Sequence, residues 1–274
     1  MIYKINSLEY NVNIVGSGPP LLLLHGFTGS LATWDPFIPK FSTDYMTISV
    51  DLMGHGQTDA PTHPERYSIE NAADDLVELL NQLNVEKCHL LGYSMGGRLA
   101  LMLACRYPAR IQSLMLESSS PGLKTDRERR ERVESDAKLA NFIEQAGIEA
   151  FIHHWENIPL FQTQKRVRLE EKARLRSLRL QNSIRGLANS LRGMGTGAQP
   201  SLWTCLPTLS MPILLITGAL DTKYVSIAKQ INEQVKRAKL AIVDDAGHTV
   251  HFEKKDRFSK LVLDFLHQFK EELF

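Results

Sequence analysis

The sequence contains few cysteines and carries almost no net charge. Its 274 residues include three cysteines, Cys88, Cys105 and Cys205. Their odd number and their spacing fit neither a disulfide framework nor a zinc site, so we expect three small buried side chains in a reducing compartment. The formal net charge of +1 gives no reason to expect nucleic acid or an anionic membrane as a partner.

Long apolar runs and metal-ligand clusters are also missing. No stretch approaches the roughly 20 apolar residues that a helix needs to cross a bilayer. Residues 1–18 alternate like a pair of strands and lack the basic start and apolar centre of a secretory signal. His153 and His154 are adjacent, so on a helix they point in different directions. We therefore expect a cytoplasmic protein without metal or cofactor, and the sequence leaves its oligomeric state open, a monomer included.

What is present is an alternation of short apolar runs with amphipathic helices. The pattern predicts helices such as residues 69–83 and a final helix at 257–272. Buried strands are predicted at residues 21–24, 46–50, 88–91, 113–116, 212–217 and 240–243. Because the strands are separated by connections long enough for crossovers, we expect an α/β fold with a mostly parallel sheet and helices on both faces.

The alternation is interrupted between residues 119 and 206. This segment is rich in predicted helices and in charge, with 15 Lys and Arg against 10 Asp and Glu. We interpret it as a basic helical cap inserted into an acidic core formed by residues 1–118 and 207–274. The alternative, a solvated face of salt-bridged helices, stays open for most of its individual arginines.

The strongest chemical signal is the run from Gly92 to Gly97, which contains Ser94. A serine between glycines, after a strand and before a helix predicted at residues 98–105, fits the strained turn that exposes a nucleophile above a sheet. Glycines are needed there because neighbouring Cβ atoms would collide. The pattern alone is a moderate signal, and the strand and helix around it strengthen it.

Two further residues follow strands in the order that an α/β-hydrolase fold requires. Asp221 comes after the strand predicted at 212–217, and His248 comes after the strand at 240–243. Singly, such an Asp is more often a helix cap and such a His a structural residue. Together with Ser94 they predict a catalytic triad in which His248 is the base and Asp221 fixes its tautomer.

The segment His25-Gly26-Phe27 follows the first predicted buried strand. Its position predicts an oxyanion hole formed by the backbone N–H groups of Phe27 and Met95, and we place His25 among the substrate-binding residues. The later run from Asp51 to Gly56 is interpreted as a structural turn, with His55 structural and not catalytic.

Arg98 is unusual for a simple esterase. It lies four residues after Ser94, so it falls one helical turn along on about the same face. A guanidinium there favours a substrate with a carboxylate near the reacting atom, because arginine binds carboxylates with a bidentate, permanently charged group. The alternative is a buried ion pair with an acidic neighbour.

Several segments together resemble the MenH family of the α/β-hydrolase superfamily. They are residues 92–98, Arg132-Val-Glu-Ser-Asp136, Trp155 to Phe161, Arg179 to Ser183 and Gly195 to Trp203. The resemblance covers essentially the whole chain, including the cap, which is the most variable part of α/β hydrolases. It implies a menaquinone-pathway lyase, which releases pyruvate from 2-succinyl-5-enolpyruvyl-6-hydroxy-3-cyclohexene-1-carboxylate to give 2-succinyl-6-hydroxy-2,4-cyclohexadiene-1-carboxylate.

The resemblance also implies roles for individual residues. Arg98, Arg132 and Arg179 would bind the substrate carboxylates, and Tyr93 and Trp155 would line the pocket. Ser94 would act as a base toward a carbon-bound proton. A serine hydrolase acting on an anionic substrate, such as a carboxylesterase, thioesterase or carbon–carbon bond hydrolase, is the alternative. A binding protein without turnover is a third hypothesis, disfavoured because all three triad residues are present.

Overall fold

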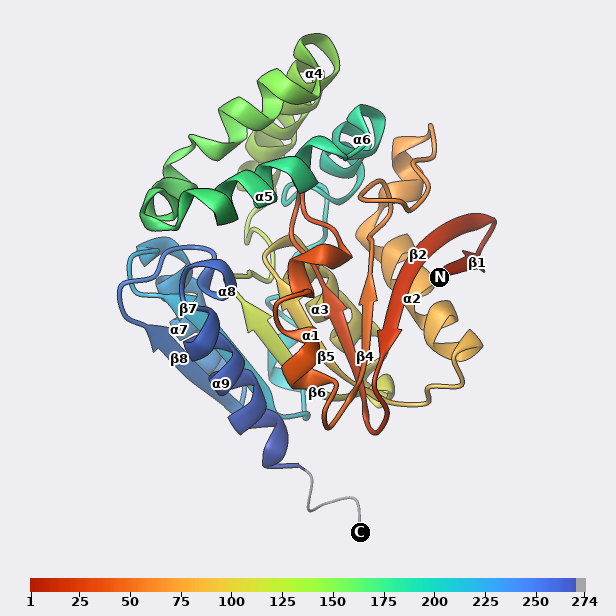
Figure 1. Cartoon of the computed structure of the whole chain (residues 1–274), viewed down its shortest axis with the longest axis vertical. Coiled ribbons are helices and arrows are strands. Elements are labelled where there is room, and N and C mark those ends of the chain that lie inside the picture. The colour runs from red at the N-terminus through yellow and green to blue at the C-terminus, as the bar shows by residue number, and fades with distance from the viewer. Residues whose placement is uncertain (270–274) are drawn as a thin grey trace.

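A single eight-stranded sheet lies at the centre of the computed structural model, which describes residues 1–269 (Figure 1). Its strands are β1 (Ile2–Ile5), β2 (Leu8–Val15), β3 (Pro20–Leu24), β4 (Met46–Val50), β5 (Cys88–Tyr93), β6 (Ile111–Glu117), β7 (Ile213–Gly218) and β8 (Ala238–Val243). Their order is β1-β2-β4-β3-β5-β6-β7-β8. Strands β3 to β8 are parallel, and only the pairs β1–β2 and β2–β4 are antiparallel. The predicted α/β class with a mostly parallel sheet is confirmed.

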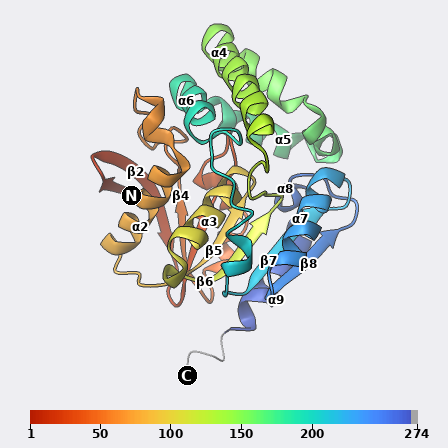
Figure 2. The same cartoon turned by 180° about the vertical axis from the view of Figure 1, so that it is seen from behind.

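Helices cover both faces of the sheet because successive strand residues point to opposite sides. Leu22 and Leu24 pack toward α2 (Ile69–Gln82), α3 (Met95–Arg106) and α7 (Thr222–Gln234), which Figure 2 shows in front of the sheet. Leu21 and Leu23 pack on the other face with α1 (Ile38–Phe41) and α9 (Lys255–His267). Both faces of the sheet are therefore buried from solvent, which explains why the central strands are continuous apolar runs.

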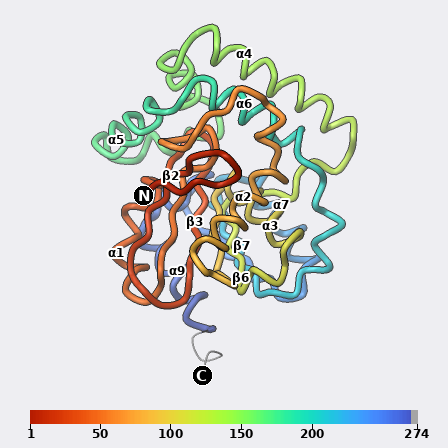
Figure 3. The backbone as a smooth tube through the Cα atoms, turned by 90° about the vertical axis from the view of Figure 1, so that its right-hand side faces the viewer, coloured from red at the N-terminus to blue at the C-terminus, as the bar shows by residue number. Residues whose placement is uncertain are grey.

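The segment between β6 and β7 forms a layer above the carboxyl ends of the parallel strands (Figures 1 and 3). We call residues 119–206 the cap. It contains α4 (Asp126–Glu156), the 3-10 helix η4 (Pro159–Arg166), α5 (Leu169–Leu180) and α6 (Ile184–Met194). Thr125 caps α4 through a capping box with Glu128, and α4 is kinked at Gly147, where φ is 82°. Helices α4 and α6 share a small apolar core that includes Ile143, Phe151 and Leu187.

The remaining elements are short. They are the 3-10 helices η1 (Leu31–Trp34), η2 (Pro64–Tyr67), η3 (Pro108–Arg110) and η5 (Leu206–Thr208), and the single-turn helix α8 (Val250–Glu253). The last helix was predicted to reach residue 272, but α9 ends at His267, and residues 270–272 lie outside the described part of the chain. Within residues 1–269, no helix is both long and apolar enough to span a membrane.

The cysteine prediction is wrong for two of the three residues. Cys105, in the last turn of α3, forms a disulfide with Cys205, which lies where the cap returns to the core. Cys88 is a free, buried thiol, as predicted. The pairing was missed because 100 residues separate the two cysteines, so no local spacing pointed to it. The disulfide also removes the argument from cysteine content for a reducing compartment.

Candidate active site

Ser94 lies in a sharp turn between β5 and α3. Its φ of 50° and ψ of −106° are strained for a residue with a side chain. The turn is possible because its neighbours are glycines: a Cβ on Gly92 would lie 2.4 Å from the carbonyl oxygen of Gly96. A Cβ on Gly96 would lie 2.3 Å from the carbonyl oxygen of Leu24. The glycines thus allow a turn that presents the Ser94 hydroxyl at the carboxyl edge of the sheet.

The three residues predicted as a triad lie within hydrogen-bonding distance. His248 Nε2 lies 3.0 Å from Ser94 Oγ, and His248 Nδ1 lies 2.7 Å from Asp221 Oδ2. The other oxygen of Asp221, Oδ1, accepts a hydrogen bond from the backbone N–H of Tyr224 at 3.3 Å. Asp221 therefore both caps α7 and holds the imidazole. This geometry lets His248 take a proton from Ser94 while Asp221 stabilises the resulting imidazolium.

The two residues whose backbone N–H groups were predicted to form an oxyanion hole both line the cavity of Ser94. They are Phe27, in the loop after β3, and Met95, the first residue of α3, and His248 lines the same cavity. Neither N–H donates to an acceptor among residues 1–269. The N-terminus of α3 adds a partial positive charge that favours an anion at this point.

The structure does not bring His25 to the cavity. Its side chain is fully buried, with Nε2 accepting a hydrogen bond from the N–H of Leu52 and Nδ1 bonded to the Gly26 carbonyl oxygen. Burial lowers the pKa of His25 to about 4, so the ring is neutral. The structure therefore does not support the expected contact between His25 and the substrate. The hydrogen bonds of His25 instead join the loop after β3 to the loop after β4. His55 is also buried and structural.

The cavity above the triad carries positive charge. Arg98, Arg132, Trp155 and Tyr93 line it together with Ser94 and His248. Arg98 is 8% exposed, and burial lowers the pKa of its guanidinium to about 10, so it stays protonated at neutral pH. The indole Nε1 of Trp155 is buried and has no acceptor within residues 1–269. The cavity therefore offers donors and cations to an anionic ligand.

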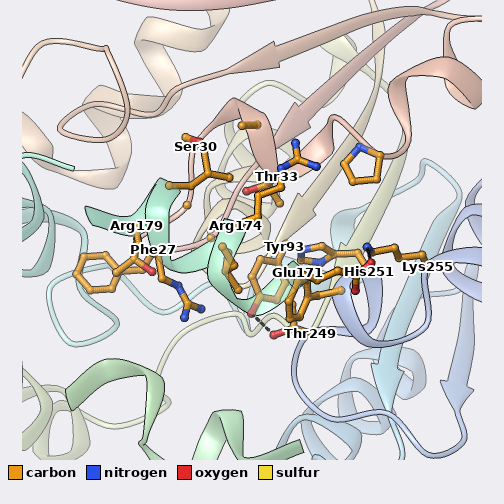
Figure 4. A pocket seen from close by; sticks show the side chains of 18 of the residues that line it. Phe27, Ser30, Thr33, Tyr93, Glu171, Arg174, Arg179, Thr249, His251 and Lys255 are labelled. Carbon is orange, nitrogen blue, oxygen red and sulfur yellow. Dashed lines mark hydrogen bonds and ion pairs between the residues drawn. The ribbon is translucent and has the colours of Figure 1, made fainter. Parts of the chain in front are cut away.

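Arg179 lies in a second, adjoining cavity (Figure 4). The two cavities share Phe27, Tyr93 and Phe161 as a common wall. Figure 4 shows Arg179 and Phe27 at one end of the second cavity and Lys255 at the other. Arg179 is buried, lies 3.5 Å from Glu156 and stacks over the Phe161 ring. The three predicted arginines are thus divided, with Arg98 and Arg132 above the triad and Arg179 beyond the aromatic wall.

Sequence reasoning missed several residues around the site. Glu117 is fully buried at the end of β6, and its carboxylate accepts hydrogen bonds from both the backbone N–H and Nδ1 of His251. The His251 ring packs edge-on against Tyr93, with centroids 4.6 Å apart. Tyr224 packs in the same way against His248. The position of Glu117 at a strand end was an available signal, whereas the Tyr224 contact depends on the orientation of α7.

No arrangement suited to a metal ion is found among the described residues. No group of three or more His, Cys, Asp or Glu side chains converges in residues 1–269. The site is built from hydrogen-bonding and cationic groups of the protein itself.

Comparison with known proteins identifies the family. Residues 19–255 match the α/β-hydrolase fold family. The chain is 48% identical over 246 residues, 90% of this chain and 89% of the other, to a Bacillus subtilis (strain 168) protein named provisionally as a 2-succinyl-6-hydroxy-2,4-cyclohexadiene-1-carboxylate synthase. It is 30% identical to the synthase of that name from Salmonella paratyphi C (strain RKS4594), over 86% of this chain and 88% of the other.

A solved structure gives the same result. MenH from S. aureus superposes with a TM-score of 0.90 at 35% identity, covering 94% of this chain and 98% of that one. The chain belongs to the MenH family. The match extends across the cap as well as the sheet, so the resemblance found in residues 92–98 and in the cap segments is confirmed.

Proposed function

We propose that the protein is a lyase of menaquinone biosynthesis that converts 2-succinyl-5-enolpyruvyl-6-hydroxy-3-cyclohexene-1-carboxylate into 2-succinyl-6-hydroxy-2,4-cyclohexadiene-1-carboxylate and pyruvate. The single observation that carries the proposal is the presence of Arg98 and Arg132 in the cavity of the hydrogen-bonded triad. The proposed substrate bears several carboxylates, and guanidinium groups are the side chains best suited to bind them.

In the proposed mechanism, the triad removes a proton from carbon. His248 takes the proton of Ser94, and the Ser94 oxygen removes a carbon-bound proton from the substrate. The electron pair of that C–H bond passes to the neighbouring carbonyl oxygen, where the N–H groups of Phe27 and Met95 stabilise the enolate. Collapse of the enolate forms a C2=C3 double bond, shifts the existing C3=C4 double bond to C4=C5 and breaks the C5–O bond to the enolpyruvyl group. The released enolpyruvate takes up the proton held by His248 and becomes pyruvate, which returns the triad to its starting state.

The two cavities suggest how a long anionic substrate is held. Arg98 and Arg132 would bind carboxylates near the reacting atoms, with the Nε1–H of Trp155 as a further donor. Arg179 would bind a carboxylate that extends past Tyr93 into the adjoining cavity.

We also propose a cytoplasmic location. This proposal rests on the menaquinone pathway and no longer on the cysteine content.

A serine hydrolase is the competing function. The same triad would then use Ser94 as a covalent nucleophile, and water would complete the reaction. The arginines favour elimination from a polycarboxylate, because a simple ester offers no charge to bind them. The intact hydrogen bonds of the triad also argue against a binding protein without turnover.

A coupled assay tests the proposal. The enolpyruvyl substrate is generated in situ, and pyruvate release is followed with the wild type, Ser94→Ala and, as a control, Ser226→Ala on the exposed side of α7. We expect rapid release by the wild type and by the control variant, and a loss of about a thousandfold or more in kcat for Ser94→Ala. Release at the spontaneous rate, together with turnover of simple esters, would show that the triad belongs to a hydrolase.

A further inference from the structure

Arg98, a buried cation four residues after Ser94, is hydrogen-bonded only to neutral groups. Arg98 Nη1 donates to the carbonyl oxygen of Met194 at 2.8 Å and to Oε1 of Gln199. No carboxylate forms an ion pair with Arg98 within residues 1–269. The other two arginines differ, because Arg132 contacts Asp136 at 2.7 Å and Arg179 contacts Glu156 at 3.5 Å. Arg98 therefore keeps its full positive charge beside the triad.

Gln199 is buried and lines neither of the two cavities. It is 1% exposed, lies where the cap returns toward β7, and is absent from the residues that line either cavity. A Cβ on Gly122 would lie 2.7 Å from Gln199 Nε2, so the glycine, at a φ of 89°, leaves room for the amide. Nε2 itself has no hydrogen-bond partner among the described residues. The amide oxygen, which accepts the hydrogen bond from Arg98, is thus the only polar atom of this side chain with a partner among residues 1–269.

We propose that Gln199 is a positioning residue that orients the Arg98 guanidinium toward the triad cavity and, because it is neutral, leaves the positive charge free for a substrate carboxylate. This inference rests on the proposed function and deepens it. An ordinary buried arginine is stabilised by a carboxylate, which would cancel its charge before the substrate arrived. An amide oxygen supplies the hydrogen bond without that cancellation.

The charges around Arg98 support this reading. Arg132 from α4 and Tyr224 from α7 line the same cavity as Arg98, and the charge of Asp136 on α4 also acts on Arg98. Asp136 is already bonded to Arg132, and that pair is neutral as a whole. The charge of Arg98 is therefore not cancelled by an ion pair of its own, and Lys223 adds a further cation to the same cavity, which suits a carboxylate of a ligand.

The decisive variant is Gln199→Glu. Glutamate has nearly the same shape, and no hydrogen bond of Nε2 is lost because that atom has no partner within residues 1–269. The substitution would convert the contact into a buried ion pair with Arg98. We expect KM for the enolpyruvyl substrate to rise by about tenfold or more, with kcat changed by less than about threefold. The midpoint of thermal unfolding should not fall, which distinguishes lost charge from lost structure.

A second readout is independent of turnover. Binding of succinate, used as a dicarboxylate probe, is measured by isothermal titration calorimetry in the wild type, Gln199→Glu and Gln268→Glu. The last variant adds the same charge at an exposed position, where the residue bonds Lys239. We expect weaker binding of about tenfold for Gln199→Glu only. Gln199→Leu, which removes the acceptor, should weaken binding and also lower the unfolding midpoint.

The outcomes separate the two proposals. If the wild type releases pyruvate but Gln199→Glu keeps KM and succinate affinity within about twofold, the role of Gln199 is wrong and the lyase proposal stands. If the wild type releases no pyruvate but Gln199→Glu binds succinate more weakly, the reaction is wrong and the role of Gln199 stands. A fall in the unfolding midpoint of Gln199→Glu, with proportional losses in kcat and 1/KM, would reduce Gln199 to a structural residue.

Discussion

Buried charges are paired on the core side of the site, whereas on the side facing the cap Arg98 has no ion-pair partner among residues 1–269. In the core, each buried acid of the site faces a basic partner: Asp221 contacts His248, and Glu117 contacts His251. On the side facing the cap, Arg98 has neutral acceptors only, and the cap carries an excess of Lys and Arg over Asp and Glu. Paired groups hold a fixed geometry for proton transfer, whereas an unpaired cation is available to bind a ligand.

We therefore expect the core side of the site to carry out the proton transfer and the side facing the cap to bind the substrate. Changes in the core should act mainly on kcat, because the triad moves the proton. Changes facing the cap should act mainly on KM, because in the proposed mechanism the guanidinium groups bind the substrate in both the ground state and the transition state.

The largest expected effect is that of Asp221→Asn. Asparagine is as good a helix cap as aspartate, so α7 should keep its N-cap and the protein its stability. The amide no longer favours the tautomer that accepts the Ser94 proton, so kcat should fall by about ten-thousandfold with KM nearly unchanged. Steady-state pyruvate release measures both parameters, and Asp264→Asn, an exposed position on α9, is the control. A loss confined to KM would contradict the division between core and cap.

The disulfide tests how firmly the cap is tied to the core. Replacing Cys105 and Cys205 together with Ser should lower the free energy of unfolding by about 4 kcal/mol, because the cross-link closes a loop of 100 residues in the unfolded chain. Urea unfolding with and without reductant measures the effect. Reductant should destabilise the wild type and leave the double variant unchanged. Equal stability of oxidised and reduced wild type would show that the disulfide does not form.

Acid should weaken the core through its neutral histidines. Burial lowers the pKa of His25 to about 4 and of His55 to about 3, below the ordinary value of 6.5. Between these values the unfolded chain binds protons that the folded chain does not, so stability falls as pH falls below about 6.5. From pH 7 to pH 5, each histidine should remove about 2 kcal/mol from the free energy of unfolding.

The variant His55→Gln isolates one part of that acid effect. Its unfolding free energy, measured in urea at pH 7 and pH 5, should depend less on pH than that of the wild type by about 2 kcal/mol. An exposed histidine, His63, provides the control His63→Gln. An unchanged pH dependence in His55→Gln would mean that the ring is not held neutral.

The smallest predicted change concerns the cap alone. Arg132→Gln should raise KM about tenfold and alter kcat little, because it removes a guanidinium from the triad cavity and leaves the buried Asp136 carboxylate without its ion pair. Arg130→Gln, an exposed residue on the same helix, should leave both parameters unchanged. A similar KM for the two variants would mean that the cap arginines do not select the substrate.

The sequence allowed the core to be predicted better than the cap. Ser94, Asp221 and His248 each follow a predicted strand, and parallel strands bring their carboxyl ends to one edge, so local patterns sufficed to assemble the site. The contact between Gln199 and Arg98 depends on how the cap returns over α3. The same holds for the Cys105–Cys205 pair, and neither could be inferred from spacing.

Two assignments of binding residues show the same limit. His25 follows a strand end, but its ring turns into the protein to bond Leu52, and nothing in the local sequence specifies that rotamer. Arg179 was grouped with Arg98 and Arg132, although the aromatic residues between the cavities separate it from them. In both cases tertiary packing, and not residue type, decides whether the side chain faces a cavity and which cavity that is.

The most direct test of the whole account is product analysis by proton NMR while the wild type consumes the enolpyruvyl substrate. Elimination predicts equal amounts of pyruvate and the conjugated cyclohexadiene, both absent with Ser94→Ala beyond the spontaneous reaction. A hydrolysed product that retains its enolpyruvyl group would contradict the account and assign the triad to a hydrolase.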